Sequence, residues 1–206
     1  LAKGIVSHDT AVRKGLFKKG IKDIQTFELD KKEMLIIGFG RIGKSMIQKC
    51  ISFNMNVKVF DPFVDKKIIE KKGAEKLENL LDGLKNADFV SLHVPLTNET
   101  KNLINLNNLK KMKKTAIIIN TSRGGIVNEL DLNKALNENI IFGAGIDVFE
   151  QEPVNKKNPL TKNNRVLLSP HSATFTNECK IRMAKQTVKN IIDFFEKKID
   201  KTMIVN

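Results

Sequence analysis

The sequence predicts an α/β fold built around a doubly wound parallel sheet, and two observations support this prediction. Short β-branched and apolar runs alternate along the chain with stretches of helical period, which is typical of a parallel sheet with helices on both faces. The pattern GxGxxG, at residues 38–43, directly follows the first of these runs and opens a helical stretch. With 206 residues, the chain is long enough for one large domain or for one domain with an appendage.

The apolar runs indicate six strands, at 34–37, 57–60, 89–94, 116–120, 140–147 and 166–168. The stretches between and after them indicate six helices, at 42–53, 65–72, 77–84, 106–111, 129–137 and 177–198. In the last helix, apolar residues recur every three or four positions, so we expect one of its faces to be buried. Before the first strand, residues 1–20 have a basic, helical character and residues 23–32 form a polar connection.

The composition is strongly basic, with 36 Lys and Arg against 23 Asp and Glu and a formal net charge of +13. Such an excess raises the possibility of a nucleic-acid binder. However, 31 of the basic residues are Lys and only 5 are Arg, and the chain has no Trp or Tyr. Base recognition relies on Arg and on aromatic stacking, so we interpret the charge as a solvated lysine surface and expect no nucleic-acid partner.

Other function classes find no support in the sequence. No apolar run approaches the roughly 20 residues that a membrane span requires, and no signal-peptide pattern opens the chain. We therefore expect no membrane partner and a cytoplasmic location. The two cysteines, Cys50 and Cys179, lack metal-ligand spacing, so no metal site is indicated.

The glycines of the GxGxxG pattern have separate roles in a strand–turn–helix unit. Gly38 permits a tight turn, Gly40 lets a pyrophosphate approach the backbone, and Gly43 lets the helix pack closely against the sheet. The free N–H groups of the helix then face the phosphates. Asp61 follows the next strand, where an acid accepts hydrogen bonds from the adenosine ribose hydroxyls and repels a 2′-phosphate. The pattern predicts a dinucleotide cofactor, with NAD preferred over NADP.

Four polar segments follow strands, where an open α/β sheet places its ligands. They are 94–97, 120–125, 147–153 and 169–173, and together they supply an arginine, two kinds of acid and a histidine. At these residues the sequence resembles the NAD-dependent D-2-hydroxyacid dehydrogenases, which share a Rossmann domain. The matching motifs, in order, are GFGRIG, LHVPLTNETKNLIN, INTSRGGIVNE, GAGIDVFEQEP and LLSPHSA.

The resemblance implies three catalytic residues. Arg123 would bind the carboxylate and the carbonyl oxygen of the substrate, a task suited to a planar, always charged guanidinium. His171 would be the general acid and base, because an imidazole exchanges protons near neutral pH. Glu152 would accept a hydrogen bond from the other imidazole nitrogen. Glu150, two residues closer to the strand, lacks the Glu-Pro context and is expected to be exposed.

The resemblance also implies a set of cofactor-binding residues. Asp147 would hold the nicotinamide carboxamide or its ribose side, and Arg41 and Ile42 would lie along the pyrophosphate. The cofactor groove would be lined by Val94, Pro95, Thr100, Thr121 and Ser122.

Members of this family have two domains, and the dinucleotide domain is inserted into the chain of the substrate domain. The resemblance therefore implies an interdomain helix and linker at 1–25, the NAD-binding domain at 26–175, and a closing helix at 176–206 that returns toward the substrate domain. On this interpretation the chain lacks most of the substrate domain.

The implied reaction is reversible hydride transfer between nicotinamide and C2 of a D-2-hydroxy acid or 2-keto acid, as in a phosphoglycerate dehydrogenase, by a homodimer. The particular acid stays open. One alternative is a dinucleotide-sensing module on the same fold, such as a corepressor, which keeps the site residues without significant turnover.

Overall fold

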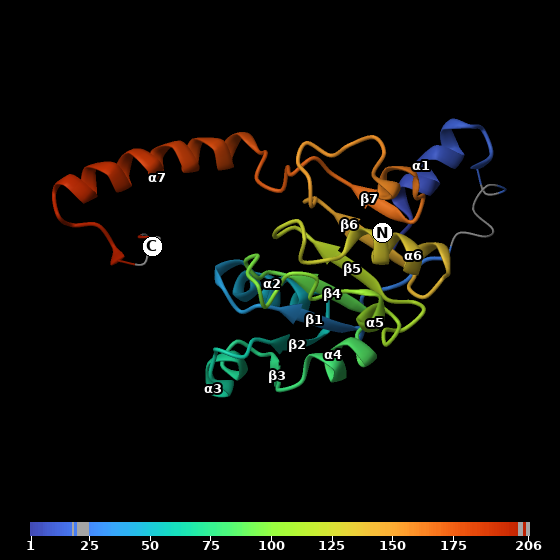
Figure 1. Cartoon of the computed structure of the whole chain (residues 1–206), viewed down its shortest axis with the longest axis horizontal. Helices are drawn as coiled ribbons and strands as arrows, with labels where there is room; N and C mark the ends of the chain where they lie inside the picture. Colours follow the sequence, from blue (N-terminus) through green and yellow to red (C-terminus); the bar gives the residue numbers. More distant parts are fainter. Residues whose placement is uncertain (18, 20–24, 202–203, 205–206) are drawn as a thin grey trace. The chain divides into compact units, whose positions relative to one another are not determined.

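The computed structural model describes residues 1–17, 19, 25–201 and 204, and it comprises two compact units. The first unit, Leu1–Pro170, is an α/β domain, and the described part of the second, His171–Asn206, contains the long helix α7 (Figure 1).

A seven-stranded parallel sheet forms the centre of the first unit, with strand order β3-β2-β1-β4-β5-β6-β7. The strands are β1 (Glu33–Ile37), β2 (Asn56–Phe60), β3 (Glu75–Leu77), β4 (Phe89–Leu92), β5 (Ile117–Asn120), β6 (Gly143–Ile146) and β7 (Val166–Leu168). The order reverses at β1, which pairs with β2 on one side and with β4 on the other. This strand order confirms the predicted Rossmann sheet. In open α/β sheets, ligands bind in a crevice where the strand order reverses, which here lies at the carboxyl ends of β1 and β4.

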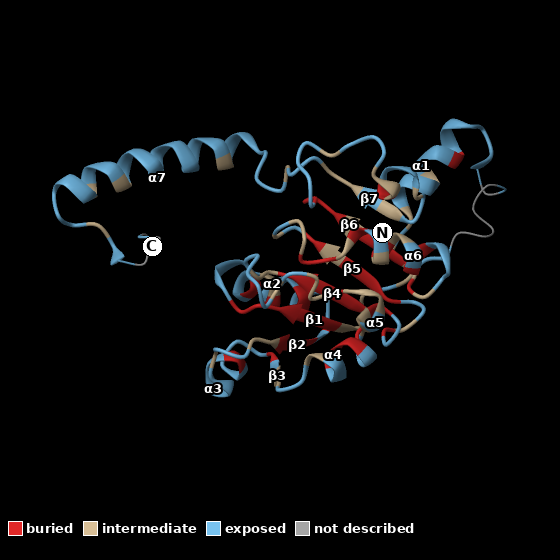
Figure 2. Cartoon of the chain, viewed as in Figure 1, coloured by how far each residue is buried: buried red, intermediate tan, exposed pale blue. Residues whose placement is uncertain are grey.

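Helices cover both faces of the sheet. They are α2 (Arg41–Ser52), α3 (Lys66–Glu70), α4 (Leu80–Asn86), α5 (Leu106–Leu109) and α6 (Glu129–Asn137), with a short 3₁₀ helix η2 (Pro159–Lys162). Helices α2 and α3 pack on one face, where Ile47 and Ile69 join a buried cluster with Ile36 and Val59. The buried residues, coloured red in Figure 2, are concentrated on the strands.

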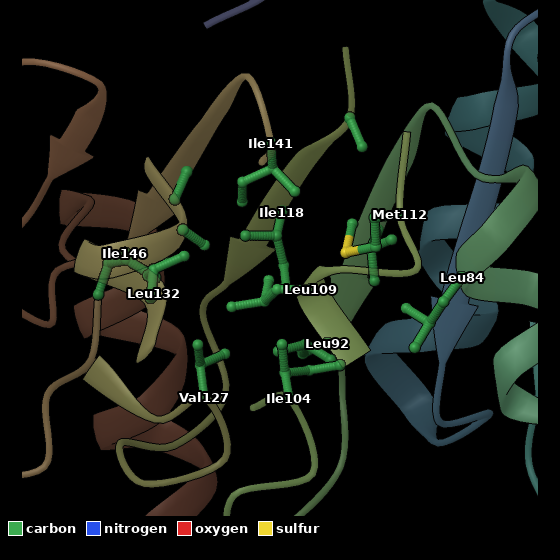
Figure 3. Packing of buried hydrophobic residues seen from close by; sticks show 14 of the residues in the cluster. Leu84, Leu92, Ile104, Leu109, Met112, Ile118, Val127, Leu132, Ile141 and Ile146 are labelled. Carbon is green, nitrogen blue, oxygen red and sulfur yellow. The ribbon is translucent and has the colours of Figure 1, made fainter. Parts of the chain in front are cut away.

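The opposite face is covered by α4, α5 and α6, which contribute Leu84, Leu109 and Leu132 to a second buried cluster (Figure 3). Each of these helices begins after an asparagine whose side chain accepts a backbone N–H of the first turn, namely Asn79, Asn105 and Asn128. The predicted helix 129–137 is confirmed at both ends.

Three sequence predictions within the first unit are wrong in detail. Strand β3 was not predicted, and the helix expected at 77–84 begins only at Leu80. Three residues at the edge of a sheet are too few for a recognisable apolar run. The helix expected over 1–20 is limited to α1 (Ile5–Arg13), because Gly4 has a left-handed conformation with φ 57°. Part of this stretch, and residues 23–24 of the polar connection, lie outside the described residues.

The second unit is built on α7 (Asn177–Phe195). Thr176 is its N-cap residue, and the Thr176 hydroxyl accepts the Cys179 N–H at 3.1 Å. The helix was predicted, but the expectation of a buried face is wrong for this structure. None of its residues is buried, and Val188 is 57% exposed. Among the described residues of this unit, no second long helix or sheet is present against which the apolar stripe of α7 could pack. Within the described residues, no helix is both long and apolar enough to cross a bilayer.

Candidate functional site

The turn between β1 and α2 has the backbone of a phosphate cradle. Gly38 is buried with φ 98°, and a Cβ there would lie 2.5 Å from the carbonyl oxygen of His93 at the end of β4. A Cβ at Gly43 would lie 2.1 Å from the Gly38 carbonyl oxygen, so both positions require glycine. Gly40 differs, because a Cβ there would meet no atom within 4 Å. The N-terminus of the twelve-residue helix α2 is therefore accessible to a ligand, and Arg41 and Ile42 are exposed on its first turn.

Asp61, which follows β2, is hydrogen-bonded to the same turn. Its Oδ2 accepts the Phe39 N–H at 2.8 Å, and its Oδ1 accepts the Phe63 N–H at 3.0 Å. The carboxylate thus joins the end of β2 to the GxGxxG turn and places a negative charge beside it. The turn-bracing role was not predicted from the sequence. An exposed glycine, an accessible helix N-terminus and an adjacent carboxylate fit the phosphate and ribose of a dinucleotide.

The segment after β4 forms the next part of the crevice. Ser91 Oγ and His93 Nε2 lie 2.9 Å apart, and burial lowers the pKa of His93 to about 4, so this imidazole is neutral at physiological pH. Thr100 closes the following loop, because its hydroxyl donates to the Pro95 carbonyl at 2.6 Å and accepts the Thr97 N–H at 2.7 Å. Val94 is half-buried and Pro95 is exposed.

Arg123 lies on the loop after β5, which the buried Asn120 side chain organises. Asn120 Oδ1 accepts the Ser122 hydroxyl at 2.7 Å, and Asn120 Nδ2 donates to the Arg123 carbonyl at 2.9 Å. The Arg123 side chain is exposed, and its guanidinium donates to the Ser122 carbonyl at 2.7 Å. Thr121 is also exposed. Asn120 was not among the predicted functional residues, although its position at the end of β5 was a signal in the sequence.

Asp147 directly follows β6 and is buried, with 3% exposure. Its Oδ1 accepts the Ser169 hydroxyl, which joins the ends of β6 and β7. Asp147, Ser169 and Thr121 line a groove of about 650 Å³ whose other walls are mainly apolar. Three strands therefore contribute polar groups to one concave surface at the carboxyl edge of the sheet.

Glu152 lies on the loop after Asp147 and is exposed, and its Oε1 accepts the Phe149 N–H at 3.0 Å. This loop contacts the Arg123 loop, because a Cβ at Gly124 would lie only 1.8 Å from the Phe149 carbonyl oxygen. Glu150 is exposed, as predicted, yet its Oε1 accepts the Glu129 N–H at 3.1 Å. The sequence analysis gave Glu150 and Glu129 no structural role.

His171 is the first residue of the second unit and is exposed, with φ 51°. Arg123 and Glu152 belong to the first unit, which brings their two loops together. The meeting of His171 with these residues stays a prediction.

Comparison with known proteins identifies the class of protein to which this chain belongs. Residues 1–173 match the family model for the D-isomer specific 2-hydroxyacid dehydrogenase NAD-binding domain. The chain therefore belongs to the D-isomer specific 2-hydroxyacid dehydrogenase family, and NAD is the cofactor of the matched domain. This confirms the family, the fold and the cofactor predicted from the sequence.

Two curated relatives are similar to this chain over most of its length. A glyoxylate reductase from Korarchaeum cryptofilum is 39% identical over 207 residues, covering 98% of this chain and 61% of the relative. A D-3-phosphoglycerate dehydrogenase from Methanocaldococcus jannaschii is 37% identical, covering 87% of this chain and 34% of the relative. The chain thus spans about three fifths of the length of the first relative and a third of the second.

Two solved structures have the same fold as this chain. The glyoxylate reductase from Paecilomyes thermophila superposes with a TM-score of 0.85 at 28% identity, covering 95% of this chain and 58% of that one. The D-lactate dehydrogenase from Escherichia coli superposes with a TM-score of 0.82 at 29% identity, covering 97% of this chain and 61% of that one.

Proposed function

We propose that this chain is the NAD-binding part of a dehydrogenase that transfers a hydride between nicotinamide and C2 of a D-2-hydroxy acid or 2-keto acid. The observation that carries the proposal is the contact between the Arg123 loop and the Glu152 loop at the carboxyl edge of a sheet whose first turn is a phosphate cradle. An arginine and a carboxylate beside a dinucleotide site supply the groups that a keto-acid reductase requires.

The chemistry divides between the cofactor and the protein. When bound, NAD(H) supplies or accepts the hydride. The Arg123 guanidinium binds the substrate carboxylate and polarises the carbonyl oxygen. His171 donates a proton to that oxygen during reduction and removes it from the hydroxyl during oxidation, and Glu152 orients the imidazole by accepting its other N–H.

In this proposal, residues at the carboxyl edge of the sheet would hold the cofactor. The α2 N-terminus, with Gly40, Arg41 and Ile42, would bind the pyrophosphate, and Asp61 would accept hydrogen bonds from the adenosine ribose hydroxyls. Toward the nicotinamide, the residues that would contact the cofactor are Asp147, Ser122, Thr121, Thr100, Pro95 and Val94. The support for this arrangement is that these residues follow β1, β2, β4, β5 and β6 at one edge of the sheet.

The proposal also includes the location, the oligomeric state, the domain boundaries and the substrate of the protein. We propose a cytoplasmic homodimer, with the NAD-binding domain at 26–175, an interdomain segment at 1–25, and a segment at 176–206 that returns toward a substrate domain. The substrate is a small 2-hydroxy or 2-keto acid, and a phosphoglycerate-like or related acid is our first choice. No observation favours the corepressor-like alternative.

A turnover screen tests the proposal. The natural protein that carries this sequence is mixed with NADH and a panel of 2-keto acids that includes glyoxylate and hydroxypyruvate, and the loss of nicotinamide absorbance is followed. We expect at least one acid to be reduced. Saturable NADH binding without reduction of any acid would contradict the enzymatic proposal and would favour a sensing role.

A further inference from the structure

We propose that Glu129 is a positioning residue that holds the loop carrying Glu152 against the loop carrying Arg123. The proposal rests on the proposed function, because it concerns two residues to which that function assigns the chemistry. Glu129 itself is the first residue of α6 and is distinct from the groups proposed to contact substrate.

The Glu129 carboxylate is a buried acceptor of two hydrogen bonds, and the residue is only 9% exposed. Its Oε1 accepts the Glu150 backbone N–H at 2.6 Å, and its Oε2 accepts a hydrogen bond from Asn158 Nδ2. In return, the Glu129 N–H donates to Glu150 Oε1 at 3.1 Å. A buried carboxylate is costly unless such donors satisfy it, so these bonds define where the loop after β6 must lie.

Residues 149–150, which Glu129 holds through the Glu150 N–H, also orient Glu152. The Glu150 N–H donates to Glu129, while the neighbouring Phe149 N–H donates to Glu152 Oε1 at 3.0 Å. The Phe149 carbonyl oxygen packs on Gly124, next to Arg123. Residues 149–150 therefore contact Glu129, Glu152 and the Arg123 loop together, and Glu129 fixes them through charge-assisted bonds.

The chemistry of the partners requires a carboxylate at position 129. A backbone N–H can only donate. Asn158 Oδ1 accepts the Leu160 N–H at 3.0 Å, which turns the Asn158 amide nitrogen toward Glu129. Glutamine would keep the shape of the side chain, but its NH₂ group would face one of the two donors. The Glu129→Gln substitution therefore removes one hydrogen bond and places the new NH₂ group against a second donor, which is either the Glu150 N–H or Asn158 Nδ2.

Amide hydrogen exchange in peptides that cover 147–152 measures the position of this loop directly. We expect Glu129→Gln to accelerate exchange there by about tenfold or more, because a buried charge-assisted bond is lost. Exchange in β1 and β5 should stay unchanged. Glu138→Gln is the matched control, because Glu138 ends the same helix and pairs with Lys134 at 3.9 Å on the surface.

Kinetics with NADH and a reducible 2-keto acid provide the second measurement. Glu129→Gln should lower kcat about tenfold or more while the Kd for NADH stays within about twofold, because the GxGxxG turn is not part of the Glu129 contacts. Unchanged exchange at 147–152, or equal acceleration throughout the first unit, would overturn the positioning role. Faster exchange with an unchanged kcat would overturn its importance for the reaction.

The two proposals fail in different ways. Absence of turnover in the unsubstituted protein refutes the proposed function, whereas the exchange measurement still tests how Glu129 holds the loop. If Glu129→Gln does not fold, Glu129→Asp serves instead, because it keeps the charge on a shorter side chain. We expect that variant to accelerate exchange at 147–152 as well, and unchanged exchange would overturn the proposal.

Discussion

A methyl group at position 124 should separate the two loops that carry the proposed chemistry. In Gly124→Ala, the new Cβ would lie 1.8 Å from the Phe149 carbonyl oxygen, whereas real Cβ atoms essentially never approach closer than 3.0 Å. The Arg123 and Glu152 loops must therefore move apart by more than an ångström. A misplacement of about 1 Å in a catalytic site can lower turnover about a hundredfold, and we expect a loss of this size in kcat.

The matched variant is Gly40→Ala, at a position where a Cβ meets no atom of the chain within 4 Å. It should leave the folded structure intact and weaken NADH binding about tenfold or more, because the methyl group occupies the space where phosphate approaches the helix N-terminus. Steady-state kinetics and NADH titration of both variants separate the two effects. A wild-type kcat in Gly124→Ala would refute the inference that the loops must touch, and wild-type NADH affinity in Gly40→Ala would refute the position of the cradle.

Three further predictions concern single side chains. Asp61→Asn should weaken NADH binding and shift the NADH-to-NADPH affinity ratio toward NADPH by about tenfold, since it removes the charge that repels a 2′-phosphate, and titration with both cofactors checks this. His171→Ala should lower kcat by orders of magnitude with little change in NADH affinity, and equal loss of both would contradict its role. The pKa of His93 is about 4 in the folded protein, below the ordinary 6.5, so its contribution to stability is present above pH 6.5 and is lost as pH falls toward 4. This amounts to about 3 kcal/mol of unfolding free energy, and urea unfolding at pH 7 and pH 4.5 should show a smaller difference in His93→Asn.

The features that the sequence predicted best are those with a local cause. Buried parallel strands require continuous apolar residues, so the strands that contain Met34 and Ile117 stand out from their surroundings. The GxGxxG pattern could be assigned to a cradle because Gly38 and Gly43 are required by the packing of the turn itself, while Gly40 leaves open the space that a phosphate needs. The exposure of Glu150 was also predicted from its immediate context and is confirmed.

The features that were missed depend on partners distant in the sequence. Glu129 contacts residues 21 and 29 positions further along the chain, and no local pattern marks that pairing. Strand β3 is defined by its pairing with β2 and not by its own composition. The exposed stripe of α7 shows the converse, because helical periodicity predicts an apolar face without specifying what covers it.

A crystal structure of the natural protein with NADH and a non-reacting analogue of a 2-keto acid would test the central claim most directly. We expect the Arg123 guanidinium on the analogue's carboxylate, one His171 ring nitrogen within about 3 Å of its carbonyl oxygen, and the other ring nitrogen on Glu152. A His171 imidazole directed away from the nicotinamide, with the analogue bound elsewhere, would contradict the account.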